Sequence, residues 1–429
     1  MNRPERRNPW AWIPSLYFAE GLPYVVALNV SVIMYKRLGI SNTDIALYTS
    51  LLYLPWVIKP LWGPVVDLVR TKRLWIVSLQ LILGVLLAAV AIAIPVPGFF
   101  RATLVLFWLM AFASATHDIA ADGFYMLGLQ EHEQAAFVGV RSTFYRLAMI
   151  TGQGLLVFVA GTIETHTGGD TTFAWSVTFG ILAAMFLVFF LYHRFVLPFP
   201  SSDVQVRATG EQRPLAEFFK VFAAFFSKPR IGSILAFLLL YRFAESQLIK
   251  LVSPFLLDPR IKGGLGLTTS EVGIVYGTVG IIALTLGGLV GGFVIPRRGL
   301  RFWLWPMVIV MHLPDLMFVY LSQAQPDNFL LINIAVAIEQ FGYGFGFTAY
   351  MLYMIMVSEG DHKTAHYAIC TGIMALGMML PGMASGALQE WLGYPNFYLW
   401  VMISTIPGFI VTALVKIDKD FGRKTLKET

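Results

Sequence analysis

Three ionisable residues interrupt the apolar segment ATHDIAADGFYM, which runs from Ala115 to Met126. Asp118 and Asp122 are four residues apart, so on a helix their carboxylates lie on one face about one turn apart. Two close carboxylates in a low dielectric cannot both ionise cheaply, so one is expected to keep a proton near physiological pH. His117 adds an imidazole that can gain charge between about pH 5 and 8. We therefore predict that these three residues couple to protons; the alternative is that an aspartate pairs with an arginine and holds helices together.

Other ionisable residues also lie in apolar segments. A charge at the bilayer centre costs ~2.5 to 3.5 kcal/mol, so such residues persist when they are paired or face a cavity. From this group and its aromatic neighbours we predict a substrate-binding set of Glu20, Tyr24, Lys59, Arg141, Tyr145, Arg146, Glu339 and His366.

Two arginines in the segment VRSTFYRLAM could recognise an anionic substrate, because guanidinium groups bind carboxylate or phosphate bidentately. Arg146 lies deeper than Arg141, which could instead be an anchor at the membrane surface. Glu20 directly precedes Gly21 and Pro23, two residues that loosen a helix and free backbone groups toward a substrate.

Two further pairs are expected to be structural. Arg242 and Glu245 are three residues apart and should pair with each other or with the other half of the chain. His312 and Asp315 flank Pro314, which should open the helix and satisfy them locally.

The composition identifies the class of protein. Hydrophobic residues make up 57% of the chain and charged residues 13%, whereas soluble domains carry roughly 25% charged residues. Segments of about 20 apolar residues, long enough to cross a bilayer as helices, recur throughout. We predict an all-α integral membrane protein with twelve spans: Trp10 to Tyr35, Thr43 to Val66, Leu74 to Pro95, Ala102 to Leu129, Gln134 to Thr162, Phe173 to Leu197, Ile231 to Leu257, Ser270 to Ile295, Phe302 to Leu321, Asn328 to Ser358, Thr364 to Leu392 and Asn396 to Ile417.

A polar break rich in Pro, Ser and charge, PFPSSDVQVRATGEQRPLAEFF, separates six spans from the other six. We predict an N-terminal half at 1–197, a cytoplasmic linker at 198–230, a C-terminal half at 231–417 and a cytoplasmic tail at 418–429. Internal repetition supports two halves, because LGISNTDIALY at 38–48 is echoed by LGLTTSEVGIVY at 265–276. Each copy has a helix-capping pattern, Ser41 with Asp44 and Thr268 with Glu271.

Lys and Arg mark the cytoplasmic side of a membrane protein. They gather at both termini and in alternate loops, which predicts that both ends lie in the cytoplasm and that the first span is not a cleaved signal. This topology explains the net charge of +6 and leaves no basic patch for nucleic acid. The single cysteine, Cys370, cannot form an intramolecular disulfide. No nucleophile–base set and no metal-ligand spacing occurs, so we expect neither an enzyme nor a cofactor nor a metal.

Several motifs resemble AmpG-type muropeptide permeases, a group within the major facilitator superfamily that is related to the eukaryotic acetyl-CoA transporter. They are FAEGLPYVV, IKPLWGPVVD, ATHDIAADGF, TTSEVGIVYGTVGIIALTLGGLVGG, EQFGYGFGFTAYMLYM and HKTAHYAICTGIMALG. The resemblance implies a major facilitator fold, with substrate held near the membrane midplane between duplicated halves. It also implies proton-driven import of anhydro-muropeptides through the inner membrane. The family usually has Gln where this chain has His117 and His366.

The loop GPVVDLVRTKR resembles the loop signature of the major facilitator superfamily. The resemblance implies a gating latch formed by Asp67, Lys72 and Arg73, although membrane topology alone would also explain the basic residues. The glycines of GYGFGF follow no strand, so we interpret them as a site of close helix packing and not as a dinucleotide loop.

Three functions are therefore weighed. The first is a proton-coupled importer of muropeptides or related sugar-peptides, acting as a monomer in membrane lipid on a small anionic substrate. The alternative is a transporter of another anionic metabolite, such as an acyl-CoA or an oligosaccharide. A membrane enzyme or receptor is disfavoured because no catalytic set and no appended domain is present.

Overall fold

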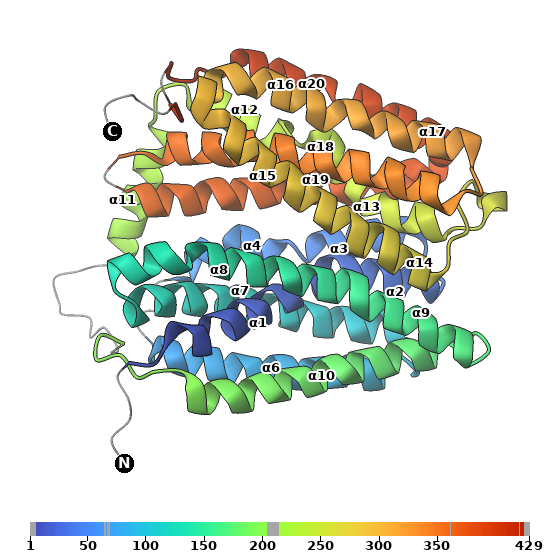
Figure 1. Cartoon of the computed structure of the whole chain (residues 1–429), viewed down its shortest axis with the longest axis horizontal. Coiled ribbons are helices and arrows are strands. Elements are labelled where there is room, and N and C mark those ends of the chain that lie inside the picture. The colour runs from blue at the N-terminus through green and yellow to red at the C-terminus, as the bar shows by residue number, and fades with distance from the viewer. Residues whose placement is uncertain are drawn as a thin grey trace. The chain divides into compact units, whose positions relative to one another are not determined.

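The computed structural model describes residues 6–63, 66, 69–203, 214–360, 362–419 and 421–423. Within these ranges the regular structure is entirely helical, as expected (Figure 1). The chain forms two compact units: unit 1 is Met1–Leu38 with Ile58–Pro214, and unit 2 is Gly39–Val57 with Leu215–Thr429. The segment 39–57, which belongs to the first half of the sequence, therefore packs within unit 2.

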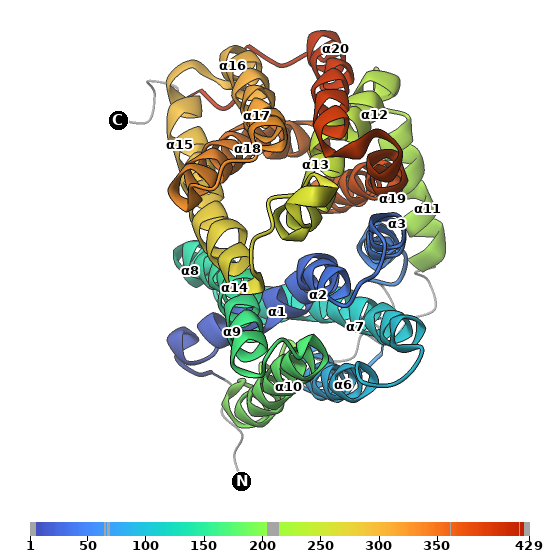
Figure 2. The same cartoon turned by 90° about the vertical axis from the view of Figure 1, so that its right-hand side faces the viewer.

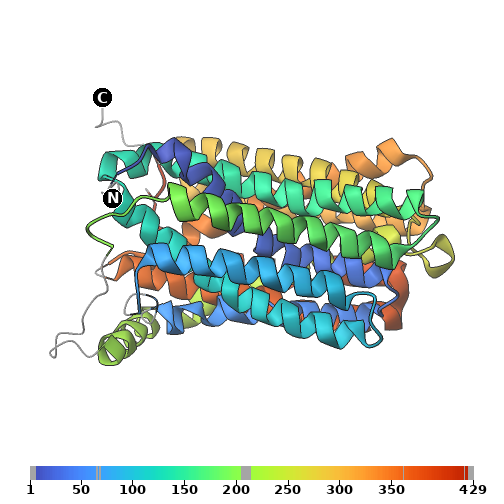
Figure 3. The same ribbon diagram turned by 90° about the horizontal axis from the view of Figure 1, so that it is seen from below.

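Unit 1 is a helical bundle. Its helices are η1 (Pro9–Ala11), α1 (Ile13–Val25), η2 (Val26–Val30), α2 (Ser31–Arg37), η3 (Lys59–Leu61), α6 (Lys72–Ala93), α7 (Phe99–Gly128), α8 (Glu131–Met149), η4 (Ile150–Leu156), α9 (Val157–His166) and α10 (Thr171–Val196). α6 packs between α7 and α10 (Figure 3), and α1 packs against α7 and α8. Pro23 lies inside α1 and removes one backbone hydrogen bond of the helix, and the π-helical turn η2 follows α1.

Unit 2 contains the remaining helices. They are α3 (Asn42–Leu51), α4 (Leu54–Ile58), α11 (Pro214–Phe226), α12 (Ile231–Leu240), α13 (Phe243–Leu257), η5 (Arg260–Lys262), α14 (Thr269–Val272), η6 (Gly273–Gly280), α15 (Ile281–Arg298), α16 (Leu300–His312), η7 (Leu313–Asp315), α17 (Leu316–Ala324), α18 (Phe329–Ser358), α19 (Lys363–Ile403) and α20 (Ile406–Leu414). α15 and α16 both pack against α18 (Figure 2), and α3 packs against α13 and α19.

In the described residues, nine helical segments are long and apolar enough to span a membrane, or ten when one bent pair is counted as a single span. The twelve predicted spans map onto these segments with three differences. The seventh, Ile231 to Leu257, qualifies only together with Lys220–Phe226, across a bend of 91°. The last two predicted spans form one continuous 50-residue segment, 365–414, but Gly393 has a non-helical φ of 74° inside it. The second predicted span is divided among α3, α4 and η3.

The capping patterns of the internal repeat form as predicted. The Ser41 side chain accepts a hydrogen bond from the backbone N–H of Asp44 at 3.0 Å. The Thr268 hydroxyl accepts one from the N–H of Glu271 at 3.2 Å, and the Glu271 carboxylate accepts from the N–H of Thr268 at 2.8 Å. Both copies therefore begin a helix in unit 2.

The glycines of GYGFGF are confirmed as a packing site. A Cβ on Gly344 would collide with the Leu284 carbonyl of α15. A Cβ on Gly342 would collide with the Val310 carbonyl of α16, and one on Gly346 with Met311. Glycine thus allows α18 to approach both neighbours at backbone distance.

Candidate functional site

Five ionisable residues gather in unit 1: Glu20, Lys59, Asp118, Asp122 and Arg141. We call them the unit-1 cluster. Glu20 comes from α1, both aspartates from α7 and Arg141 from α8, and α1 packs against the other two helices. Lys59 comes from the short turn η3. The predicted spacing of the aspartates is realised, because α7 is one uninterrupted helix over both.

Asp122 forms an ion pair with Arg141, in which Nη2 of the arginine lies 2.7 Å from Oδ1. The hydroxyl of Tyr17 donates to the same oxygen at 3.2 Å. The guanidinium also lies over the rings of Tyr17 and Tyr125, at 4.5 and 5.1 Å from their centres. The side chains of Arg141 and Asp122 remain 30% and 44% exposed. This ion pair links α7 to α8. Asp122 therefore has the alternative role predicted from the sequence, in which an aspartate pairs with an arginine and holds two helices together.

Asp118 lies one turn earlier on α7 and faces a different cation. Its Oδ2 is 3.6 Å from Nζ of Lys59. This distance is within an ion pair but beyond a hydrogen bond, so the contact between Asp118 and Lys59 is looser than that between Asp122 and Arg141. Its partner is a flexible ammonium, which can move as the carboxyl gains or loses a proton.

Glu20 is the most deeply buried acid of the unit-1 cluster. It is 6% exposed, and its Oε2 accepts no hydrogen bond from the described residues. Asp118, Asp122, Arg141 and Lys59 all act on it electrostatically. Three acids and two cations therefore share one interior site.

His117 belongs to a different network. It is buried and faces α6, where the amide nitrogen of Gln80 lies 3.1 Å from its Nε2. His193 donates from Nδ1 to the Gln80 side-chain oxygen at 2.9 Å, and Ser15 contacts His193 Nε2 at 2.9 Å. The side chains of consecutive residues on a helix point about 100° apart, so His117 and Asp118 face different sides of α7. The structure thus does not bring His117 to the two aspartates.

Tyr24, Tyr145 and Arg146 are half-buried in unit 1. Gly21 of α1 lies against Tyr145 and Ala148 of α8, so that a Cβ there would meet them at 3.0 to 3.3 Å. Besides its predicted role in loosening the helix, Gly21 therefore allows α1 to pack closely on α8 beside Tyr145.

Of the three predicted gating residues, Asp67 lies outside the described residues. Lys72 and Arg73 begin α6, and their backbone N–H groups donate to the Asp203 carboxylate at 2.8 and 3.0 Å. The Arg73 guanidinium also stacks on Phe199, 3.7 Å from the ring centre. Both basic residues thus contact the segment that follows α10.

The two predicted binding residues of unit 2 are separated along the bundle. Glu339 lies in the middle of α18, fully buried, and accepts from the Gln340 side chain at 3.0 Å. His366 lies at the start of α19 and packs against the rings of Phe225 and His362, at 5.4 and 5.8 Å. These two residues do not form one site.

Two structural expectations for unit 2 are met only in part within the described residues. Arg242 does not pair with Glu245; it donates to the Tyr343 hydroxyl. His312 and Asp315 do flank a helix break at η7, but no hydrogen bond satisfies the Asp315 carboxylate, and Nδ1 of His312 is 3.8 Å from it. A proline turn opens the helix without supplying side-chain partners.

Sequence reasoning missed several polar residues of unit 1. Tyr17 lies one helical turn before Glu20, and this spacing could have placed it on the same face. Gln80 lies in an apolar stretch of α6 and His193 near the basic end of α10, and buried polar residues of this kind are usually partnered. Asp203 lies in the polar break, where no pattern distinguishes a helix cap from a solvated acid.

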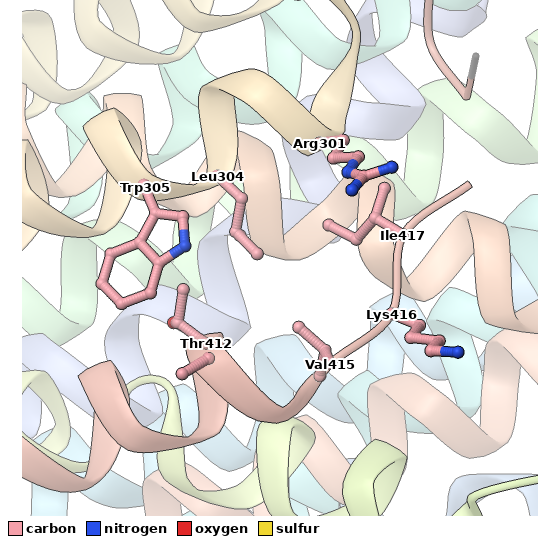
Figure 4. Close-up of a pocket in the computed structure, with 8 residues that line it drawn as sticks. Arg301, Leu304, Trp305, Thr412, Val415, Lys416 and Ile417 are labelled. Carbon is pink, nitrogen blue, oxygen red and sulfur yellow. The ribbon is translucent and has the colours of Figure 1, made fainter. Parts of the chain in front are cut away.

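A surface cavity of about 450 Å³ lies between α16 and α20 in unit 2 (Figure 4). Arg301 and Lys416 lie on one side of it and Trp305 on the other. Its lining contains no carboxylate among the described residues, so this cavity offers no proton carrier.

Comparisons with known proteins point to membrane transporters. The family model of the Major Facilitator Superfamily matches residues 15–359. The anhydromuropeptide permease of Escherichia coli (strain K12) is 25% identical over 421 residues, covering 95% of this chain and 80% of that protein. The putative transporter AmpG 4 of Rickettsia conorii is 25% identical over 410 residues, covering 92% of this chain and 94% of that protein. These matches confirm the resemblance to AmpG-type permeases.

Solved structures agree on the fold. The crystal structure of the nucleoside transporter NupG matches with a TM-score of 0.68 at 16% identity, covering 95% of this chain and 98% of that one. The D-xylose–proton symporter matches with a TM-score of 0.66 at 14% identity, covering 97% and 99%. The predicted major facilitator fold is therefore confirmed, and these relatives and neighbours are transporters rather than enzymes.

Proposed function

Because the chain belongs to the Major Facilitator Superfamily, we propose that it is a proton-coupled secondary transporter that imports anhydro-muropeptides or related sugar-peptides. The curated E. coli relative, an anhydromuropeptide permease, supports this class of substrate. Import would proceed by alternating access, with the two halves predicted from the sequence opening in turn to either side of the inner membrane.

The unit-1 cluster is the observation that carries the proposal. We assign the recognition of a substrate carboxylate to Arg146, which is half-buried five residues beyond Arg141 on α8. Tyr24 and Tyr145 would stack on sugar rings beside it. Lys59 and Arg141 would keep the local charge balanced while an anionic substrate is bound.

We assign proton carriage to Asp118, with Asp122 as its neighbour. Asp118 has a loose ammonium partner at 3.6 Å, whereas Asp122 is held by a guanidinium and a hydroxyl at once. A proton on Asp118 would neutralise one of the three acids of the unit-1 cluster, which lowers the cost of keeping their charges in a low-dielectric environment. Deprotonation would restore the contact with Lys59.

The orientation of the chain is part of the proposal. Both termini and the segment between the halves would lie in the cytoplasm, as the distribution of Lys and Arg predicts. A Ser201→Cys variant should then react with an impermeant maleimide in inverted membrane vesicles and not in intact cells. Labelling in intact cells would reverse this orientation.

Uptake of radiolabelled anhydro-muropeptide into vesicles with an imposed proton gradient tests the function. We expect accumulation that collapses with a protonophore and that unlabelled anhydro-muropeptide competes away. Competition by an acyl-CoA or an unrelated oligosaccharide, with none by anhydro-muropeptide, would favour the alternative anionic substrate. Unchanged accumulation with the protonophore would remove proton coupling.

A further inference from the structure

Two helix breaks in unit 2 bring ionisable side chains together. α16 ends at His312, the 3-10 turn η7 follows, and α17 begins after Asp315. In a 3-10 turn, residues three apart eclipse each other, so His312 and Asp315 point the same way. The second break lies at Tyr241 and Arg242, between α12 and α13, and Glu245 stands in the first turn of α13. Broken helices of this kind are where membrane transporters place ion sites.

Glu245, His312 and Asp315 form what we call the unit-2 triad. Each offers one ligand atom, and these atoms all lie within 4.8 Å of one another. A divalent transition metal binds carboxylate oxygen and imidazole nitrogen at about 2.0 to 2.2 Å. Small side-chain rotations are therefore enough to bring the three ligands onto one ion.

The triad is fully buried. Glu245 is 0% exposed, and His312 and Asp315 are each 1% exposed. No described residue hydrogen-bonds either oxygen of Asp315, and Nδ1 of His312 has no hydrogen-bond partner. The side-chain neighbour of Glu245 is another acid, Glu339, and not a basic residue. Buried carboxylates without donors are costly, and a bound cation is one of the few ways to stabilise them. The rings of Tyr241 and Phe409 pack on His312 at 6.4 and 5.7 Å, which restricts its imidazole.

Acidic side chains outnumber basic ones in this region. Glu339 lies beside Glu245, so three carboxyl groups share this region with one guanidinium, that of Arg242. With all three ionised, the region carries an excess of two negative charges. Arg242 is turned toward Tyr343 and Phe347, 4.7 Å from the ring centre of Phe347, and does not pair with the triad. A divalent cation would neutralise the excess and satisfy the free ligand atoms together.

We propose that Glu245, His312 and Asp315 bind one divalent first-row transition metal ion, of the class of Zn²⁺ or Mn²⁺, inside unit 2. One imidazole with two carboxylates suits these ions, whereas Mg²⁺ and Ca²⁺ prefer all-oxygen ligands. The sequence did not predict a metal here, because four helical segments, η5, α14, η6 and α15, separate the helix of Glu245 from the helix that ends at His312. The ion would join the break before α13 to the break between α16 and α17, and so fix the packing of three helices.

Metal analysis of the tag-free protein in detergent tests the site. After dialysis against ZnCl₂ and removal of free metal, elemental analysis should find one Zn²⁺ per chain. Glu245→Gln and Asp315→Asn should each weaken Zn²⁺ binding by more than about a hundredfold, since loss of an outer-shell partner alone costs 10- to 100-fold. ZnCl₂ should also raise the unfolding temperature of the wild-type chain and leave that of Glu245→Gln unchanged.

His166→Gln is the matched control, because His166 is exposed and lies in unit 1. It should keep the full stoichiometry. The proposal is wrong if the wild-type protein takes up less than one Zn²⁺ and gains no thermal stability from it. It is also wrong if the variants bind Zn²⁺ as the wild type does. Protons would then be left to neutralise the triad. Failure of Glu245→Gln to fold is checked by its unfolding temperature without metal. The assay involves no substrate, so its outcome is independent of the transport proposal.

Discussion

The unit-1 cluster and the unit-2 triad differ in how their ionisable side chains are exposed and paired. In unit 1, Asp118 and Asp122 each face a cation and stay in contact with water, at 13% and 44% side-chain exposure. In unit 2, Glu245 and Asp315 are fully buried, and Asp315 accepts no hydrogen bond from the described residues. Accessible, ion-paired acids such as Asp118 and Asp122 can exchange protons and bind solutes, whereas buried acids such as Glu245 and Asp315 depend on a counter-ion or a proton. Under the two proposals above, unit 1 would carry the transport chemistry and a bound ion would stabilise the packing of unit 2.

The largest effect is expected for Asp118→Asn. The amide imitates the protonated acid and cannot release a proton, so gradient-driven accumulation should be lost while counterflow of substrate continues. Both are measured in the same vesicles, with Asp122→Asn as a milder control because Arg141 already neutralises that acid. Accumulation by Asp118→Asn at the wild-type level would make this acid structural.

Cysteine accessibility tests the contrast between the clusters directly. In a Cys370→Ala background, Asp122→Cys should react with a hydrophilic methanethiosulfonate reagent at least about tenfold faster than Asp315→Cys, since thiol reactivity follows exposure. The reaction is followed in detergent with EDTA, so that the new thiol at position 315 carries no metal. Equal rates would show that water reaches both clusters.

Arg146→Ala should weaken substrate binding about tenfold, the value of one charge-assisted contact of about 1.4 kcal/mol. Arg146→Lys should recover part of this loss, because an ammonium keeps the charge but not the planar fork. Equilibrium binding of labelled anhydro-muropeptide to the three purified proteins gives the comparison. Identical affinities would take Arg146 out of the binding site.

Gly344→Ala tests how unit 2 is kept closely packed. The added methyl meets the Leu284 carbonyl of α15, so we expect a loss of about 1 to 3 kcal/mol in stability and a lower unfolding temperature in detergent. Gly292→Ala on α15 is the matched control, because nothing lies within 4 Å of the new methyl group there. Similar unfolding temperatures for both variants would mean that α15 and α18 can separate freely.

The smallest effect is expected for His117→Gln. The glutamine carbonyl can accept the Gln80 amide as Nε2 does now, so stability should change by less than about 1 kcal/mol. Coupled accumulation and its pH profile should be retained, since His117 faces Gln80 and not the aspartates. A shift in the pH optimum of accumulation would show that His117 takes part in proton coupling.

The sequence alone was sufficient to predict features that depend on composition or on the residues of a single helix. The proportion of charged residues established a membrane protein, and the four-residue spacing of Asp118 and Asp122 put them on one helix face. The Ser41 and Thr268 caps were readable because capping involves residues three apart. Close packing was predictable from GYGFGF because glycine has no side chain to keep a neighbouring helix away.

The tertiary structure decided what depends on the rotation and distance of one helix relative to another. Periodicity gives the face of α7 that carries Asp118, but not that Lys59 lies opposite it or that His117 faces Gln80. Nor does it show that the segment 39–57 packs within unit 2. Glu245 and Asp315 are 70 residues apart, and they converge because two separate helix breaks turn toward each other. Local propensity specifies each break, whereas the meeting of their side chains depends on the packing of the whole unit.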